Sequence, residues 1–558
     1  MITLLRTISF KLVIRILLLS SILTFSLSSQ LMSETASSIS EDAVLSRSLI
    51  SASIPNLPPA NVVGQIDKHD TLSWRGIPYA APPVGNLRWR APRNPKKWSG
   101  NRQAMRFGNI CPQKSNIYLG LNKEGGFNQP IGNEDCLYLN VWRPRSDETN
   151  LPVLFFIHGG SNILGSSSQY SYNGASFSQK ANAVVVTINY RLGSLGWLFN
   201  EILTDGDSKD NSGNYGTLDL IHGLKWVRDN IKAFGGDPST ITVAGQSAGC
   251  VNTWALLLSP LAEGLIDRAL CMTGIPLLYS KEKGHKHSNQ LIDELLIDQG
   301  HAKNKAKATQ IRQESSSSWL QAFLRNIPAE TIVRLTSSVV PVHFNDGHVL
   351  PEKGYRKLFF GKYERIPMIL STTKNEGTFF AGKFLGYYNI DDETLWHMAN
   401  YQNPNEVKLT DVMSDFETLS YPLVHSLVTK SFDTLIDIFT NVANGSQPEI
   451  NVYRFHFDWD NLPGGWKKIL GAMHGIEIPF LFGNFPEKNT LDLSRIMATE
   501  ETQVERAELS NQFIRYVAQF MRNGNPNRPS DGLLDWPSWS NKANGRLVFD
   551  SEIYTSSR

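Results

Sequence analysis

Five short apolar runs, rich in β-branched residues, alternate along the chain with amphipathic helical stretches. Strands that are apolar on both faces are typical of a parallel sheet covered by helices on both sides. Between the second and third runs, Leu218, Ile221 and Leu224 follow a helical spacing. The pattern therefore predicts an α/β fold with a large, mostly parallel central sheet flanked by helices on both faces. The five runs are residues 151–157, 183–188, 240–244, 366–371 and 451–455.

No internal repeat or long low-complexity linker divides the body of the chain, so residues 57–556 are predicted to form a single domain. The most polar stretch, residues 280–318, predicts a surface excursion between helices. Among the 558 residues, 54 Lys and Arg face 52 Asp and Glu. A protein that neutralises many phosphates usually carries a clear excess of positive charge, and this chain has none. We therefore expect no nucleic-acid partner.

The first thirty residues differ in kind from the rest. Arg6, Lys11 and Arg15 precede an uncharged apolar run at 16–27, and small polar residues follow it. This arrangement predicts a signal peptide over residues 1–29, a variable segment over 30–56 and a secreted mature chain. The alternative is a retained signal anchor, although the uncharged run is shorter than the ~18 residues of a membrane span. We expect no stable membrane insertion of the mature chain.

Secretion would bring the chain into an oxidising compartment, where its four cysteines can form disulfides. Cys111 and Cys136 bracket a loop rich in Gly, Asn and Pro, and we expect them to be bridged. Cys250 and Cys271 stand in apolar contexts, which favours buried, unpaired thiols. A sequon at Asn444 predicts glycosylation on an exposed loop.

The motif GQSAG at 245–249 follows an apolar run directly and leads into a helical stretch. A serine at such a strand-to-helix turn is strained, and the positions two before and two after it must lack side chains. The Ser247 hydroxyl would then stand at the carboxyl end of a central strand, near a helix N-terminus. Because GxSxG also occurs by chance, the motif alone leaves an ordinary turn open.

A serine nucleophile needs hydrogen-bond donors for the oxyanion that forms when it attacks. The sequence HGGS at 158–161 ends the run at 151–157. We expect the backbone N–H groups of Gly160 and Ser161, together with that of Ala248, to form this oxyanion hole. A plain loop is the alternative for HGGS.

In this topology the acid and the histidine should follow the serine along the chain, each after a later strand. Glu376 comes just past the run at 366–371, and it is the predicted acid. Four histidines follow Glu376, and the loop of small residues around His474 favours that one as the base. His456 lies in an alternating strand pattern and is predicted to be structural. The other two are His397 and His425.

Seven motifs in one order resemble the type B carboxylesterase and cholinesterase family of α/β-hydrolases, over residues 74–550. The resemblance implies that Ser247 is the nucleophile, His474 the general base and later acid, and Glu376 the carboxylate that orients the imidazole. The motifs are GQSAG, WRGIPYAAPPVGNLRWRAP (74–92), EDCLYLNVW (134–142), NYRLGSLGW (189–197), FGGDP (234–238), KNEGTFF (374–380) and HGIEIPFLFG (474–483).

The same resemblance implies two structural pairings. The Cys111–Cys136 bridge matches the first disulfide of the family. An ion pair between Arg75 and Glu134 is also implied.

Several positions depart from the family pattern and bear on the substrate. Ser161 stands where the family has glycine, and we expect its backbone donor to survive. Residues 124–128 hold no tryptophan, which in cholinesterases lies against a quaternary ammonium group. Gln246 replaces the acidic residue that precedes the cholinesterase nucleophile. The candidate pocket residues are Phe127, Gln246, Phe379 and Phe380, although the last two could equally pack in the core.

The sequence thus predicts a secreted serine carboxylesterase that hydrolyses small-molecule carboxylic esters through an acyl-enzyme intermediate. No metal or other cofactor is expected, because no Cys/His cluster offers ligand spacing. One alternative is a cholinesterase acting on choline esters. The other is a non-catalytic, cholinesterase-like adhesion protein, against which the presence of Ser247, Glu376 and His474 argues.

Overall fold

The computed structural model describes residues 49–53, 60–117, 126–204, 206–337, 340–445, 450–486, 493–539 and 545–557. The predicted signal peptide and most of the segment 30–56 lie outside these ranges. Within them, the main sheet has thirteen strands, and β4 (Gly100–Gln103) pairs with β2 at one edge. The other twelve follow the order β1 (Leu49–Ser53), β2 (Ala60–Asp67), β3 (Thr71–Pro78), β7 (Tyr138–Pro144), β9 (Val184–Ile188), β8 (Leu151–Ile157), β10 (Gly236–Gln246), β11 (Arg268–Met272), β12 (Met368–Thr373), β13 (Val452–Phe457), β14 (Arg546–Phe549) and β15 (Ile553–Ser556).

The strands from β9 to β14 are parallel, and antiparallel strands flank them on both sides. This confirms the predicted fold class. The five apolar runs all fall in this parallel part, as β8, β9, β10, β12 and β13. Strand β8 coincides with its run, and each of the others begins or ends a few residues away from it.

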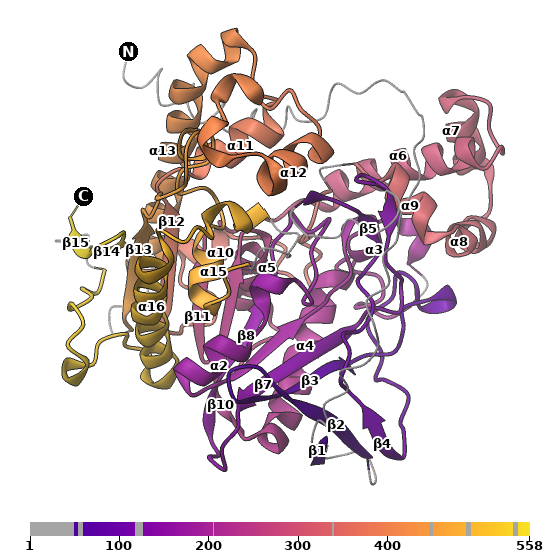
Figure 1. Ribbon diagram of the computed structural model, residues 1–558. Helices are drawn as coiled ribbons and strands as arrows, with labels where there is room; N and C mark the ends of the chain where they lie inside the picture. Colours follow the sequence, from indigo (N-terminus) through magenta and orange to yellow (C-terminus); the bar gives the residue numbers. More distant parts are fainter. Residues whose placement is uncertain are drawn as a thin grey trace, which may run out of the picture.

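Side chains of β8 show why parallel strands are apolar throughout. Phe155 and Ile157 pack into the core on one face of the sheet, and Leu154 and Phe156 into the core on the other. Helices α4 (Tyr215–Asn230) and α5 (Ala248–Leu258) cover the first face. Helices α2 (Ala175–Ala181), α15 (Glu477–Phe482) and α16 (Gln503–Asn523) cover the second. Helices therefore cover both faces of the parallel part of the sheet, and Figure 1 shows their arrangement in outline.

Two further groups of helices extend from this core (Figure 1). The first holds α6 (Lys281–Asp298), α7 (Lys305–Glu314), α8 (Ser317–Asn326) and α9 (Ala329–Leu335), and the second holds α11 (Glu376–Phe384), α12 (Asp392–Tyr401) and α13 (Asp415–Gly445). The stretch 280–318, predicted to be a surface excursion, is thus itself helical. Ser280 caps α6 through its hydroxyl, and Ile292 and Leu296 bury one face of that helix.

Both pairs of cysteines are bridged. The expected disulfide joins Cys111 to Cys136. A second joins Cys250 to Cys271, with 4.8 Å between the Cα atoms, so the expectation of free thiols was wrong. The reason lies in strand register: Cys271 pairs with Gly245 across β10 and β11, and the turn after β10 brings the first turn of α5 back over β11. No sequence spacing shows that register.

The second disulfide should contribute measurably to stability. It closes a loop with a sequence separation of 21, which corresponds to about 3 kcal/mol of unfolded-state entropy. The double variant Cys250→Ala with Cys271→Ala should therefore unfold at a clearly lower urea concentration than the wild type. A midpoint unchanged by the double substitution would contradict this.

Two other expectations need correction. The implied Arg75–Glu134 ion pair is absent, because Arg75 pairs with Asp67 and Glu134 binds Arg88, with 2.7 Å from Nε to Oε1. Asn444 lies not on a loop but in the last turn of α13, since buried residues such as Ala443 extend the apolar face of that helix to its end. Ser446, which completes the sequon, lies outside the described ranges. Among the helices described, none combines the length and the apolar character needed to cross a bilayer.

Candidate active site

Ser247 occupies a strained turn between β10 and α5. Its backbone has φ 56° and ψ −122°, a region that side-chain-bearing residues rarely adopt. A Cβ on Gly245 would come within 2.2 Å of the carbonyl oxygen of Gly249, and one on Gly249 within 2.0 Å of that of Ile157. Both positions must therefore be glycine, for the reason that the motif spacing suggested.

Glu376 and His474 meet although 98 positions separate them. Glu376 begins α11, just after β12, and it is fully buried. Its Oε2 lies 2.6 Å from Nδ1 of His474. Its Oε1 accepts hydrogen bonds from the hydroxyl of Thr273 at 2.7 Å and the backbone N–H of Thr373 at 2.8 Å. The carboxylate is thus oriented from three sides, and it fixes the imidazole with Nδ1 protonated and Nε2 available as an acceptor.

Nε2 of His474 has a partner on the residue that precedes Ser247. The side-chain nitrogen of Gln246 lies 3.2 Å from it, in position to donate. Ser247 and His474 line the same cavity, but within the described residues no hydrogen bond joins the Ser247 hydroxyl to Nε2. Such catalytic bonds are often long without substrate and tighten when it binds. The amide of Gln246 therefore competes with Ser247 for the base, a role that its sequence position did not suggest.

The glycine-bearing loop after β8 faces this site. Gly160 and Ser161 line the cavity, and both have left-handed backbones, with φ of 105° and 54°. Ser161 thus holds a conformation that favours glycine, which accounts for the glycine of the family pattern. Ala248 is the first residue of α5, directly after Ser247. Gln113 anchors the far end of the loop with two hydrogen bonds to the backbone of Gly165, at 2.8 and 2.9 Å.

The cavity has a volume of about 550 Å³. Phe379 and Phe380 line it and flank His474, with ring centroids 5.3 and 5.0 Å from the imidazole. Phe127 is not among the lining residues, because its buried ring packs against Trp396 instead. Of the four candidate pocket residues, the structure therefore brings Gln246, Phe379 and Phe380 to the cavity.

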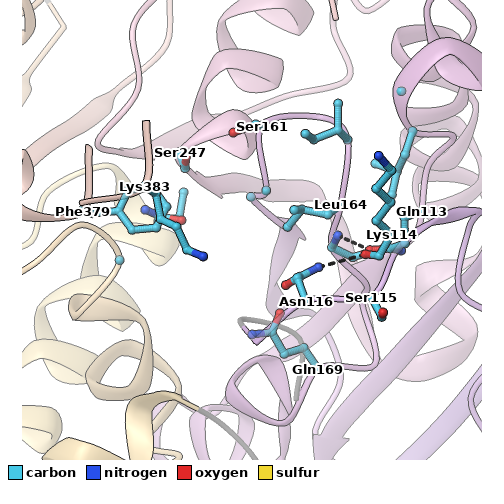
Figure 2. A pocket seen from close by; sticks show the side chains of 18 of the residues that line it. Gln113, Lys114, Ser115, Asn116, Ser161, Leu164, Gln169, Ser247, Phe379 and Lys383 are labelled. Atoms are coloured by element: carbon cyan, nitrogen blue, oxygen red, sulfur yellow. Dashed lines mark hydrogen bonds between the residues drawn. The ribbon is translucent and has the colours of Figure 1, made fainter. Parts of the chain in front are cut away.

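Three charged side chains line the cavity among the described residues: Lys114, Lys383 and Asp392. Lys383 on α11 forms an ion pair with Asp392 at the start of α12. Figure 2 shows Lys383 beside Phe379, with Lys114 across the open space from both. The sequence reasoning missed all three. Lys383 follows Phe379 at a helical spacing of four, which could have identified it. Nothing in the sequence around Lys114 points to the cavity.

Two buried titratable groups lie close to the site. Burial lowers the pKa of His158 to about 4, so this histidine is neutral, and its ring stacks on Tyr190 with centroids 4.5 Å apart. Glu477 is fully buried, and within the described residues neither of its carboxyl oxygens has a hydrogen-bond partner. Burial and the nearby Glu376 raise the pKa of Glu477 to about 8.

Known proteins resemble this chain over most of its length. A profile of the carboxylesterase family matches residues 53–555. The para-nitrobenzyl esterase of Bacillus subtilis (strain 168) is 33% identical over 497 residues, covering 86% of this chain and 91% of that protein. The acetylcholinesterase of Danio rerio is 28% identical and covers 87% of this chain and 83% of that one. A solved PNB esterase structure, 29% identical, superposes with a TM-score of 0.68 over 91% of this chain and 97% of its own. The chain belongs to the carboxylesterase family and is a carboxylic ester hydrolase.

Proposed function

We propose that the protein is a secreted serine carboxylesterase that uses Ser247, His474 and Glu376 as a catalytic triad. The observation that carries the proposal is that one cavity is lined both by a serine on a strained strand-to-helix turn and by a histidine held by a buried carboxylate. The strained turn keeps the serine at the cavity surface, and the carboxylate leaves Nε2 as a proton acceptor.

The reaction runs in two steps. Ser247 Oγ bonds to the ester carbonyl carbon while Nε2 of His474 takes the hydroxyl proton. The oxyanion is held by the backbone amides of Gly160, Ser161 and Ala248, each of which typically contributes ~3 kcal/mol to the transition state. The C–O bond to the alcohol breaks as Nε2 returns the proton to the leaving oxygen. Water then repeats the cycle on the acyl-enzyme and releases the acid.

General ester hydrolysis suits the cavity better than choline ester hydrolysis. Gln246 is uncharged where cholinesterases carry an acid, and two of the three charged lining residues are lysines. A quaternary ammonium group would meet no unpaired carboxylate among the described lining residues. The adhesion alternative is disfavoured because the Glu376–His474 bond would serve no purpose there.

We also propose secretion, through a signal peptide at residues 1–29, and glycosylation at Asn444. The two disulfides are compatible with an oxidising compartment. Residues 57–556 would then form the single mature domain.

Covalent labelling tests the proposed nucleophile. A fluorophosphonate probe should attach to the purified protein, and peptide mapping should locate it on Ser247, because the proposed base and oxyanion hole line the same cavity as that hydroxyl. Ser247→Ala should abolish the labelling. A matched control is Ser208→Ala: Ser208 also contacts a histidine, His348, at 2.9 Å, but it is exposed and lies on no strained turn. Absent labelling, or labelling that persists in Ser247→Ala, would refute the proposal.

A further inference from the structure

The charges that line the cavity do not balance among the described residues. Asp392 is the one acidic side chain in this lining, and it is paired with Lys383. That leaves Lys114 as a cation for which no acidic partner is found in the described part of the chain. An unpaired cation that is partly withdrawn from water gains from the approach of an anion.

Lys114 is held firmly at this position. It belongs to the short strand β5 (Gln113–Lys114), which pairs with β6 (Pro130–Ile131). Its neighbour Gln113 binds the backbone of both Cys111 and Gly165, at 3.0 and 2.9 Å. Since Cys111 is itself bridged to Cys136, the backbone of Lys114 is tied both to a disulfide and to the loop that carries the oxyanion hole.

A second cation, Arg334, lies near Lys114, although its own charge is partly offset by an ion pair with Asp298 at 2.7 Å. The side chain of Lys114 is partly buried, and burial together with the guanidinium of Arg334 lowers the pKa of the Lys114 ammonium group. Arg334 comes from α9, whose residues Ile332 and Val333 also line the cavity. Both effects make the isolated cation unfavourable, and a bound anion would relieve both.

Polar side chains accompany the lysine. Asn116 and Gln169 line the cavity and lie on the same side of it as Lys114 in Figure 2, whereas Phe379 and Lys383 lie on the other side with Ser247. Asn116 donates a hydrogen bond to the backbone oxygen of Lys114 at 3.1 Å. The cavity thus has a catalytic side with aromatic rings and an opposite side that is polar and cationic.

We propose that Lys114 forms an anion subsite of the ester-binding cavity, so that the preferred substrates carry a carboxylate remote from the ester bond that is cleaved. Monoesters of dicarboxylic acids are the simplest members of this class. The inference rests on the proposed function, since it assigns the substrate class of the same cavity. Under this proposal neutral esters are also accepted, whereas the positive charge of Lys114 disfavours cationic esters.

Matched ester pairs test this subsite. The substrates are mono-p-nitrophenyl esters of dicarboxylic acids, from glutaric to sebacic acid, each paired with the corresponding methyl-capped, uncharged diester. For at least one chain length the wild type should show a kcat/KM about tenfold higher for the anionic member. This ratio should fall as the ionic strength rises.

Substitutions of Lys114 test whether this residue causes the preference for anionic esters. Lys114→Met should bring the ratio to about one at the favoured length, mainly by lowering kcat/KM for the anionic ester, and Lys114→Arg should keep most of the preference. Lys362→Met, at an exposed lysine that does not line the cavity, should change neither value. A ratio near one in the wild type at every length, or one that Lys114→Met leaves unchanged, would overturn the subsite with the esterase intact. Failure to hydrolyse any ester would overturn the proposed function as well.

Discussion

Replacing Glu376 with glutamine is expected to lower kcat by about 10⁴-fold without unfolding the protein. The reason lies in the three donors around the carboxylate. The backbone N–H of Thr373 can only donate, so the new amide must turn its oxygen toward Thr373 and its NH₂ group toward Nδ1 of His474. Nδ1 then has to accept a hydrogen bond, so the ring proton of the neutral imidazole moves to Nε2. With Nε2 protonated, the imidazole can no longer take the proton of Ser247.

Steady-state kinetics on a p-nitrophenyl ester measures this loss, and the rate of fluorophosphonate labelling should fall with it. Glu364→Gln is the matched control, because Glu364 is also a partly buried glutamate that accepts a backbone hydrogen bond, from Gly264 at 2.7 Å, but it does not line the cavity. Its kcat should stay close to that of the wild type. A Glu376→Gln enzyme within tenfold of the wild type would show that His474 is not oriented by this carboxylate.

The features that the sequence could predict are those that local geometry dictates. A strand with helices on both faces must be apolar at every position, so β8 was found to the residue. The turn at Ser247 tolerates no Cβ at Gly245 or Gly249, so its position follows from spacing alone. Glu376 was found because topology places the acid after a later strand, and β12 ends three residues before it.

The features that were missed depend on contacts between distant segments. Strand β7 escaped notice because polar residues interrupt it: Asn140 is buried there, and its side chain bonds to Ser167 and Thr187, each at 3.0 Å. The Cys250–Cys271 bridge depends on the register of two strands. Lys114 reaches the cavity because a two-residue strand is tied to the loop after β8. None of these relations leaves a local pattern in the sequence.

Glu477 is a further feature that depends on contacts between distant segments. It follows His474 by three residues and, like Glu376, is fully buried, but the two carboxyls have opposite surroundings. Three donors surround Glu376, whereas no hydrogen-bond partner is found for Glu477 among the described residues. Burial, and repulsion from Glu376, raise the pKa of Glu477 from 4.5 to about 8, although nearby backbone amides oppose the rise. Glu477 is therefore protonated in the folded enzyme at neutral pH.

This raised pKa makes stability depend on pH in the direction opposite to that of an ion-paired carboxylate. Between the unfolded pKa of 4.5 and the folded pKa of about 8, the folded chain holds a proton that the unfolded chain has released. Stability therefore falls as the pH rises through this window, by about 1.4 kcal/mol per unit. Below pH 4.5 both states are protonated and the contribution is constant. Glu477→Gln keeps the shape of the neutral acid and carries no titrating proton.

The variant Glu477→Gln should therefore gain stability over the wild type by roughly 3 to 4 kcal/mol between pH 5 and pH 8. Urea unfolding followed by tryptophan fluorescence at the two pH values measures this difference, and comparing the change with pH cancels any constant packing effect of the amide. Glu393→Gln, at an exposed glutamate on α12, should show no such trend. A free-energy difference that stays constant from pH 5 to pH 8 would mean that Glu477 is ionised in the folded enzyme. The repulsion from Glu376 and the burial would then be offset by an interaction that favours the ionised form of Glu477.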